Sequence, residues 1–222
     1  MVNPIYAHLQ SKIRMKKRVG TVWYPTTPFF ADNLDAENVV VKTVDDLNGL
    51  DLLVFWGGGD VHPSLYREKN EYSYGMDLNR DKFESFIFNK ALLCVPILGI
   101  CRGAQLSCVL TGGKLWQHVD NHGRDHNIVM KDGTVIKANS THHQMMIPSK
   151  ETEILATSEK VLSPLKKTQD GKKESNDPEP EICFNDAARC LMIQGHPEYH
   201  DSPAEFKTLT FSLLDKYLGV FR

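Results

Sequence analysis

The stretch PILGICRGAQ, residues 96–105, decides the fold class of this chain. Its first half is a continuous apolar run, which is typical of a strand buried on both faces of a parallel sheet. Its second half predicts a helix that begins at Arg102 and runs to about Leu110. A strand that passes directly into a helix is the start of a strand–helix–strand unit, so the stretch indicates an α/β fold.

The same alternation continues on the N-terminal side. Apolar runs predict three earlier strands, at residues 18–24, 39–44 and 50–56. Apolar residues at near-helical spacing over 79–93 predict a helix that Asn79 or Asp81 could cap. Strands and helices that alternate in this way predict a parallel sheet with right-handed crossovers.

The second half of the chain changes to a hairpin pattern. The predicted elements are strands at 127–130 and 134–138, an extended segment at 153–157, strands at 182–184 and 190–194, and a final amphipathic helix at 203–218. Lys131-Asp132-Gly133 and Asn185-Asp186 supply the turn signals. The polar stretch 163–180, rich in proline and lysine, is interpreted as an exposed, mobile loop. Residues 1–15 are expected to be a flexible extension, and 16–222 one domain.

Composition narrows the class of protein. The chain has 222 residues and a formal net charge of -2, so no polyanion such as nucleic acid is expected as its main partner. Five cysteines without CxxC spacing predict no disulfide framework and favour a reducing, cytoplasmic setting. No apolar run approaches the roughly 20 residues that span a bilayer, so no membrane partner is expected.

Cys101 stands at the centre of the deciding stretch, in a G-x-C-x-G pattern. The pattern is that of a nucleophile elbow, in which a strand turns sharply into a helix and exposes the nucleophile at the turn. Gly99 and Gly103 remove side chains that would collide there. The helix N-terminus favours a thiolate, so we expect Cys101 to be reactive. The other four cysteines are interpreted as inert, buried residues.

A thiolate nucleophile needs a base, and the sequence offers one candidate. His196 follows the apolar run at 190–194 and lies two residues before Glu198, within the stretch QGHPE. Glu198 is close enough to orient the imidazole through its second nitrogen. Alone, His-Pro-Glu could be only a turn, but together with the elbow it predicts a Cys101–His196–Glu198 triad.

The pairing of GICRGAQ with QGHPE resembles the class I glutamine amidotransferase-like superfamily. Three further segments resemble its γ-glutamyl-γ-aminobutyrate hydrolase branch, whose members are γ-glutamyl cysteine hydrolases: GGGDVHP at 57–63, RDKFE at 80–84 and NSTHHQ at 139–144. The motifs run in the family's order over most of the chain. The resemblance implies a flavodoxin-like three-layer sandwich, with a mainly parallel central sheet and a hairpin-rich second half.

The resemblance also implies roles for residues around the triad. Backbone N–H groups of Gly58 or Gly59 and of Arg102 would form the oxyanion hole. Of the substrate-binding candidates, Gln105 follows from the residues themselves, because it lies one helical turn after Cys101. The others, His143 and Gln144, follow from the resemblance of NSTHHQ.

Metal and cofactor binding are not expected. His118, His122 and His126 are spaced by four, which would put them on one face of a helix and allow zinc binding. Asp120, Asn121 and Gly123 disfavour such a helix, so these histidines are interpreted as pocket-lining or surface residues. No organic cofactor is needed for the predicted chemistry.

The predicted activity is cleavage of the γ-amide bond of glutamine or of a γ-glutamyl compound through a γ-glutamyl thioester. Two forms of this activity stay open: a free-standing hydrolase of a small-molecule γ-glutamyl substrate, and a glutaminase subunit that delivers ammonia to a synthetase partner. A third alternative is a non-catalytic binding module on the same fold.

Overall fold

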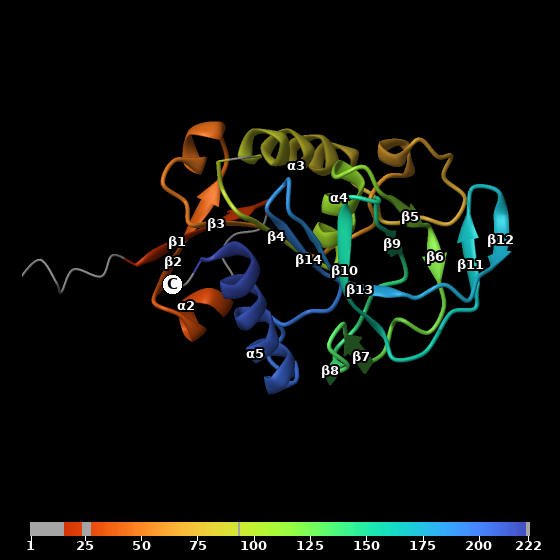
Figure 1. Cartoon of the computed structure of the whole chain (residues 1–222). Coiled ribbons are helices and arrows are strands. Elements are labelled where there is room, and N and C mark those ends of the chain that lie inside the picture. Colours follow the sequence, from red (N-terminus) through yellow and green to blue (C-terminus); the bar gives the residue numbers. More distant parts are fainter. Residues whose placement is uncertain (1–15, 24–27, 93, 221–222) are drawn as a thin grey trace, which may run out of the picture.

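The computed structural model describes residues 16–23, 28–92 and 94–220. Within them, nine strands form one large sheet: β1 (Lys17–Val22), β2 (Ala36–Val41), β3 (Leu52–Phe55), β4 (Ile97–Ile100), β7 (His126–Met130), β8 (Val135–Ala138), β10 (Thr152–Ser158), β13 (Pro180–Asn185) and β14 (Cys190–Ile193). Their order is β2-β1-β3-β4-β14-β13-β10-β7-β8, as Figure 1 shows.

The sheet has a parallel half and an antiparallel half. The strands from β2 to β14 in this order are all parallel, and β14, β13, β10, β7 and β8 pair antiparallel. The predicted hairpins are present as β7–β8 and β13–β14. The predicted α/β architecture is confirmed.

Helices cover both faces of the sheet and make it the middle of three layers. In Figure 1, α3 (Leu78–Ala91) and α4 (Arg102–Leu110) lie on one side, and α2 (Phe29–Asn33) and α5 (Ala204–Leu213) on the other. Because successive side chains of β3 point to opposite faces of the sheet, this strand packs against both helical layers. Leu52 and Val54 belong to the core under α2 and α5, whereas Leu53 and Phe55 belong to the core under α3 and α4. All four side chains are fully buried.

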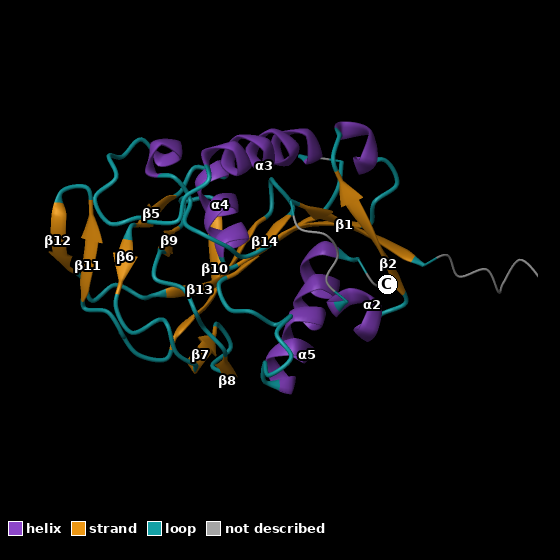
Figure 2. Cartoon of the chain, turned by 180° about the vertical axis from the view of Figure 1, so that it is seen from behind, coloured by secondary structure: helices purple, strands orange, loops and turns teal. Residues whose placement is uncertain are grey.

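Two smaller sheets lie at the end of the molecule away from β1 and β2 (Figure 2). One pairs β5 (Lys114–Trp116) with β9 (Met145–Ile147). The other contains β6 (His118–Val119), β11 (Leu165–Thr168) and β12 (Gly171–Glu174).

The prediction of a mobile loop at 163–180 is therefore wrong. Its residues form the hairpin β11–β12, and Lys166 and Glu179 are buried as an ion pair with 3.1 Å between Nζ and Oε1. The carboxylate of Glu179 also accepts hydrogen bonds from the backbone N–H groups of Leu162 and Ser163. Polar composition concealed this arrangement, although Asp170-Gly171 is a hairpin turn signal.

Three smaller expectations also change. The cap of α3 is Asp77, whose side chain accepts from the N–H groups of Asn79 and Arg80, so neither Asn79 nor Asp81 is the cap. The second strand ends at Val41, and residues Val44–Leu47 form a 3-10 turn. The expected N-terminal extension, residues 1–15, lies outside the described residues. None of the helices in the described part of the chain has the length and apolar content needed to cross a bilayer.

Candidate active site

Cys101 occupies the sharp turn between β4 and α4. Its φ of 50° and ψ of -108° are strained for a residue with a side chain, as a nucleophile elbow requires. A Cβ on Gly99 would lie 2.5 Å from the carbonyl oxygen of Gly103, and one on Gly103 would lie 2.0 Å from that of Phe55. Both glycines are therefore required by packing, as the sequence predicted.

Three adjacent parallel strands end beside this turn. The register pairs Ile193 at the end of β14 with Ile100 at the end of β4, and the N–H of Cys101 donates to the carbonyl of Ile193 at 2.8 Å. On the other side of β4, the end of β3 leads into the glycine loop that begins at Gly57. The carboxyl ends of parallel strands are where such sheets hold ligands, so the elbow lies between two candidate site segments.

His196 and Glu198 form the predicted pair. His196 Nδ1 donates to Glu198 Oε1 at 2.7 Å, and the imidazole stacks on the ring of Tyr199 with centroids 4.2 Å apart. Burial lowers the pKa of His196, but hydrogen bonds and charge at Cys101 and Glu198 outweigh it and raise the pKa to about 10. The imidazole is therefore protonated at neutral pH and contacts the thiol.

Asn139 fixes the backbone that carries this histidine. Its side-chain amide donates to the carbonyl of His196 at 2.8 Å and accepts from the N–H of His196 at 3.2 Å. Asn139 begins the NSTHHQ segment, which the sequence connected with substrate rather than with the base. The tertiary structure thus gives Asn139 a positioning contact that local sequence did not reveal.

The glycine loop lies against the triad. Gly57, which sequence reasoning did not single out, approaches His196 so closely that a Cβ would be 2.8 Å from its Cε1 atom. Gly58 lines the same cavity as Cys101 and has a φ of 143°, in the region that favours glycine. Gly59 instead packs on the backbone of Gly75, where a Cβ would be 2.0 Å from the carbonyl oxygen. In the sequence, the run of three glycines at 57–59 was the signal that the backbone approaches its neighbours closely here.

A buried ion-pair network holds the elbow and the glycine loop from behind. The guanidinium of Arg102 contacts the carboxylates of both Asp81 and Glu84. Glu84 also pairs with Arg80 at 2.9 Å, and Arg80 Nη2 donates to the carbonyl of Gly57 at 3.0 Å. The RDKFE segment therefore lies on α3, out of the cavity, and connects two segments of the site.

A cavity of about 190 Å³ opens beside Cys101. Its lining residues are Gly58, Asp60, Cys101, Gln105, Thr141, His142, His143, Gln144, His196 and Tyr199. It therefore brings together the three predicted substrate-binding residues with Cys101 and His196. Four further residues line the cavity without a predicted role: Asp60, Thr141, His142 and Tyr199.

The three predicted binding residues differ in how much of their side chain is free. Gln144 is occupied by structural hydrogen bonds, since its Oε1 accepts from the N–H of Val61 and its Nε2 donates to Ser73 Oγ. Gln105 Nε2 donates to the carbonyl of Gln144 at 2.9 Å. His143 Nε2 lies 2.8 Å from Asp60 Oδ1. Gln144 thus shapes the wall more than it offers polar groups.

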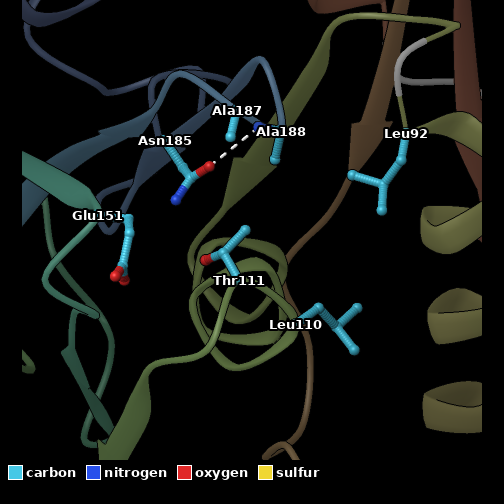
Figure 3. A pocket seen from close by; sticks show the side chains of 7 residues that line it. All are labelled: Leu92, Leu110, Thr111, Glu151, Asn185, Ala187 and Ala188. Atoms are coloured by element: carbon cyan, nitrogen blue, oxygen red, sulfur yellow. Dashed lines mark hydrogen bonds between the residues drawn. The ribbon is translucent and has the colours of Figure 1, made fainter.

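A second pocket, drawn in Figure 3, has a volume of about 390 Å³ and lies at the other end of α4. It is lined by Leu92, Leu110, Thr111, Glu151, Asn185, Ala187 and Ala188. Asn185 Oδ1 accepts from the N–H of Ala188 at 2.9 Å and so closes the β13–β14 turn (Figure 3). No nucleophile–base pair lines this pocket, so the catalytic hypothesis rests on the cavity at Cys101.

Comparison with known proteins agrees with the fold and with the family that the motifs resemble. The profile of the peptidase C26 family matches residues 26–170. The chain belongs to the peptidase C26 family. It thereby falls within the class I glutamine amidotransferase-like superfamily that the motifs resemble.

Curated relatives of this C26 protein match over part of their length. A glutamine amidotransferase-like protein of Rickettsia prowazekii is 42% identical over 96 residues, which are 40% of this chain and 31% of the relative. The glutamine amidotransferase-like protein YvdE of Lactococcus lactis is 46% identical over 70 residues, 31% of this chain and 30% of the relative. The chain thus spans about a third of the length of these relatives.

Solved structures share the fold at low sequence identity. A candidate GMP synthase subunit of Thermoplasma acidophilum superposes with a TM-score of 0.63 and 15% identity, over 93% of this chain and 94% of that one. A glutamine amidotransferase of Thermotoga maritima gives a TM-score of 0.55 and 14% identity, over 93% and 85%. These likenesses establish the flavodoxin-like α/β fold of the C26 protein.

Proposed function

We propose that this C26 protein hydrolyses the γ-amide bond of glutamine or of a γ-glutamyl conjugate, with Cys101 as nucleophile. The observation that carries the proposal is the contact of Cys101, in its strained turn, with a protonated His196 that Glu198 orients. A thiol, a histidine and a carboxylate in this order are the components of covalent acyl transfer.

In the first half of the reaction, the Cys101 thiolate attacks the γ-carbonyl carbon and forms a tetrahedral oxyanion. We assign the oxyanion hole to the N–H groups of Gly58 and Arg102; neither makes a hydrogen bond to another described residue. Free N–H donors at this position would stabilise the developing negative charge. Gly59 fits this role less well, because it packs on Gly75.

Collapse of the intermediate breaks the C–N bond and requires a proton on the departing nitrogen. The raised pKa of His196 supports its role as this proton donor, because the imidazole carries a proton at neutral pH. The amine leaves, and the γ-glutamyl group remains as a thioester on Cys101. The now neutral His196 then accepts a proton from water, whose oxygen attacks the thioester and releases glutamate and the thiolate.

The size of the cavity supports a small acyl group. Its volume of about 190 Å³ lies below the roughly 300–1,000 Å³ usual for drug-sized ligands, so an amino-acid moiety is a better match than a peptide. We assign Gln105 to a polar contact with this moiety. We assign Gln144 and His143 to the shape of the wall, because the polar atoms of Gln144 are occupied and the two ring nitrogens of His143 contact Asp60 and His118.

The alternative form of the activity is ammonia delivery to a synthetase. Two solved structures of the same fold support this alternative: PurLQS of Thermotoga maritima, with a TM-score of 0.52, and the candidate GMP synthase subunit. The segments at 57–63, 80–84 and 139–144 resemble the hydrolase branch and favour the free-standing form. We therefore propose a free-standing hydrolase, acting as one domain over residues 16–222.

An assay of the purified protein separates these alternatives. Glutamine and a panel of γ-glutamyl amines are supplied, and glutamate release is measured for the wild type and for Cys101→Ala. We expect turnover by the wild type alone and none by the variant. Turnover that appears only with a second protein would reject the free-standing form. Absence of turnover, together with no labelling of Cys101 by a glutamine-like diazo-ketone, would favour the binding module.

A further inference from the structure

A buried cluster of histidines and glutamates lies next to the cavity and has no part in the proposed reaction. His122 lies in the loop between β6 and β7, His142 in the loop between β8 and β9, and Glu181 on β13. All three side chains are at most 4% exposed. One ligand-type atom from each lies within 4.8 Å of the others. Three segments distant in sequence thus converge on one point.

The hydrogen bonds around the cluster fix which nitrogen of each ring faces inward. His122 donates through Nε2 to Glu179 Oε2 at 3.1 Å, and His142 donates through Nδ1 to the carbonyl of Gln144 at 2.9 Å. Both partners can only accept, so each neutral ring carries its proton on the outer nitrogen. Metal-binding histidines are typically oriented by such outer contacts to a carboxylate or a backbone carbonyl.

The inner nitrogens of both rings face the carboxylate of Glu181. His122 Nδ1 lies 3.2 Å from Glu181 Oε1, and His142 Nε2 lies 3.8 Å from Glu181 Oε2. Both nitrogens are buried and make no hydrogen bond among the described residues. A ring lone pair and a carboxylate repel each other unless a proton or a metal cation lies between them. Burial lowers the pKa of His122, but its contacts with Glu179 and Glu181 outweigh burial and raise the pKa to about 9, so a proton holds this position in the metal-free protein and a metal ion would displace it.

The distances suit an ion at the centre. Bonds of about 2.0–2.2 Å in tetrahedral geometry place ligand atoms about 3.3–3.6 Å apart. The observed separations of 3.2 and 3.8 Å lie just below and just above this range, so small side-chain shifts would bring the ligand atoms to it. The cluster also has charge for a cation to meet, because Glu179 and Glu181 bring two negative charges and Lys166 brings one positive charge. In the metal-free protein the histidines supply the remaining positive charge: His126 contacts acceptors with both ring nitrogens, and the glutamate contacts of His122 raise its pKa to about 9. A metal ion would replace the proton on His122.

We propose that His122, His142 and Glu181 bind a divalent transition-metal ion, with zinc as the ion that two imidazoles and one carboxylate suit best. His126 supports the site from the side, since its Nε2 lies 2.9 Å from Glu181 Oε1 and its Nδ1 contacts the carbonyl of Arg124. The sequence expectation of no metal is revised by this proposal.

The ion would act as a positioning element for the cavity wall. His142 lines the cavity beside Cys101, and its neighbours Thr141 and His143 do so as well. A metal bond from His142 to Glu181 ties this wall to β13 of the main sheet. The site is independent of the proposed hydrolysis, and its test does not use activity.

The test measures metal on the full chain, purified without a histidine tag. Protein is stripped with a chelator, incubated with zinc, desalted and analysed by elemental mass spectrometry. We expect about one zinc per chain, a melting temperature raised by about 5–10 °C at zinc concentrations 100 times Kd, and visible absorption bands of four-coordinate cobalt after exchange.

Matched variants assign the ligands. We expect His122→Asn and Glu181→Gln to weaken zinc binding by at least about 100-fold, and Glu179→Gln by about 10–100-fold through the orientation of His122. His118→Asn is the control, because His118 lies on β6 outside the cluster and should leave the stoichiometry unchanged. Wild-type protein that retains less than about a tenth of an equivalent and gains no thermal stability from zinc would overturn the proposal, whether or not the variants fold.

Discussion

The buried network behind the elbow makes a quantitative prediction about stability. Glu84 lies on α3 with a fully buried side chain and contacts two guanidinium groups, those of Arg80 and Arg102. Glu84→Gln keeps the size of the side chain and removes its charge. Arg102 then keeps its pair with Asp81, but both guanidinium groups lose their ion pair with Glu84.

The expected cost follows from that burial. Removal of one partner from a buried ion pair destabilises proteins by about 3–5 kcal/mol, because the remaining charge stays desolvated. For a chain of this length each kcal/mol lowers the melting temperature by about 2–4 °C, so we expect a decrease of about 6–20 °C. The typical free energy of unfolding is about 5–15 kcal/mol, so the variant should still fold at 25 °C.

Urea unfolding and calorimetry of wild type and variant measure this change. Glu153→Gln is the matched control, since Glu153 forms an exposed pair with Lys131 at 2.5 Å. Exposed pairs contribute about 0–1 kcal/mol, so the control should change little. If Glu84→Gln lowered the free energy of unfolding no more than the control does, the reasoning would be refuted. Such a result would mean that the ion-pair network is not shielded from water.

Three further predictions concern the elbow and the base. In urea titrations, Gly103→Ala should lower the free energy of unfolding by at least about 3 kcal/mol and should abolish labelling of Cys101, because its Cβ would lie 2.0 Å from the carbonyl oxygen of Phe55. Gly123→Ala is the control and should leave the free energy of unfolding unchanged, because a Cβ there would have no neighbour within 4 Å. Cys101→Gly should be more stable than Cys101→Ala by about 1 kcal/mol, since glycine tolerates a φ of 50°; equal unfolding midpoints would contradict the strain. The pKa of His196 is raised from 6.5 to about 10, so its contribution to stability is complete below about pH 6.5 and is lost as pH rises to about 10. The urea midpoint of the wild type should therefore fall over this pH range, and that of Cys101→Ala should fall less steeply. Equal slopes of midpoint against pH for the two proteins would argue against the contact between Cys101 and His196.

The sharp turn at Cys101 was predictable because its signal is local. Flanking glycines, an apolar strand before the thiol and a helix after it specify the turn through contacts between near neighbours in the chain. Hairpin signals at residues 131–133 and 185–186 were equally local and were correct. The candidate pair His196 and Glu198 lies within three residues, so its geometry also followed from spacing.

Contacts between distant segments were decided only by the tertiary structure. Arg102 was expected to contribute its backbone alone, but its side chain pairs with Asp81 and Glu84, about 20 residues earlier in the sequence. Burial of Lys166 likewise depends on Glu179, which composition had assigned to a mobile loop. A charged residue is stable in the interior only when a partner of opposite charge meets it there. The sequence by itself determined the turn at Cys101 and the His196–Glu198 pair. The fold determined which buried charges are paired, because that pairing depends on how the strands are ordered in the sheet.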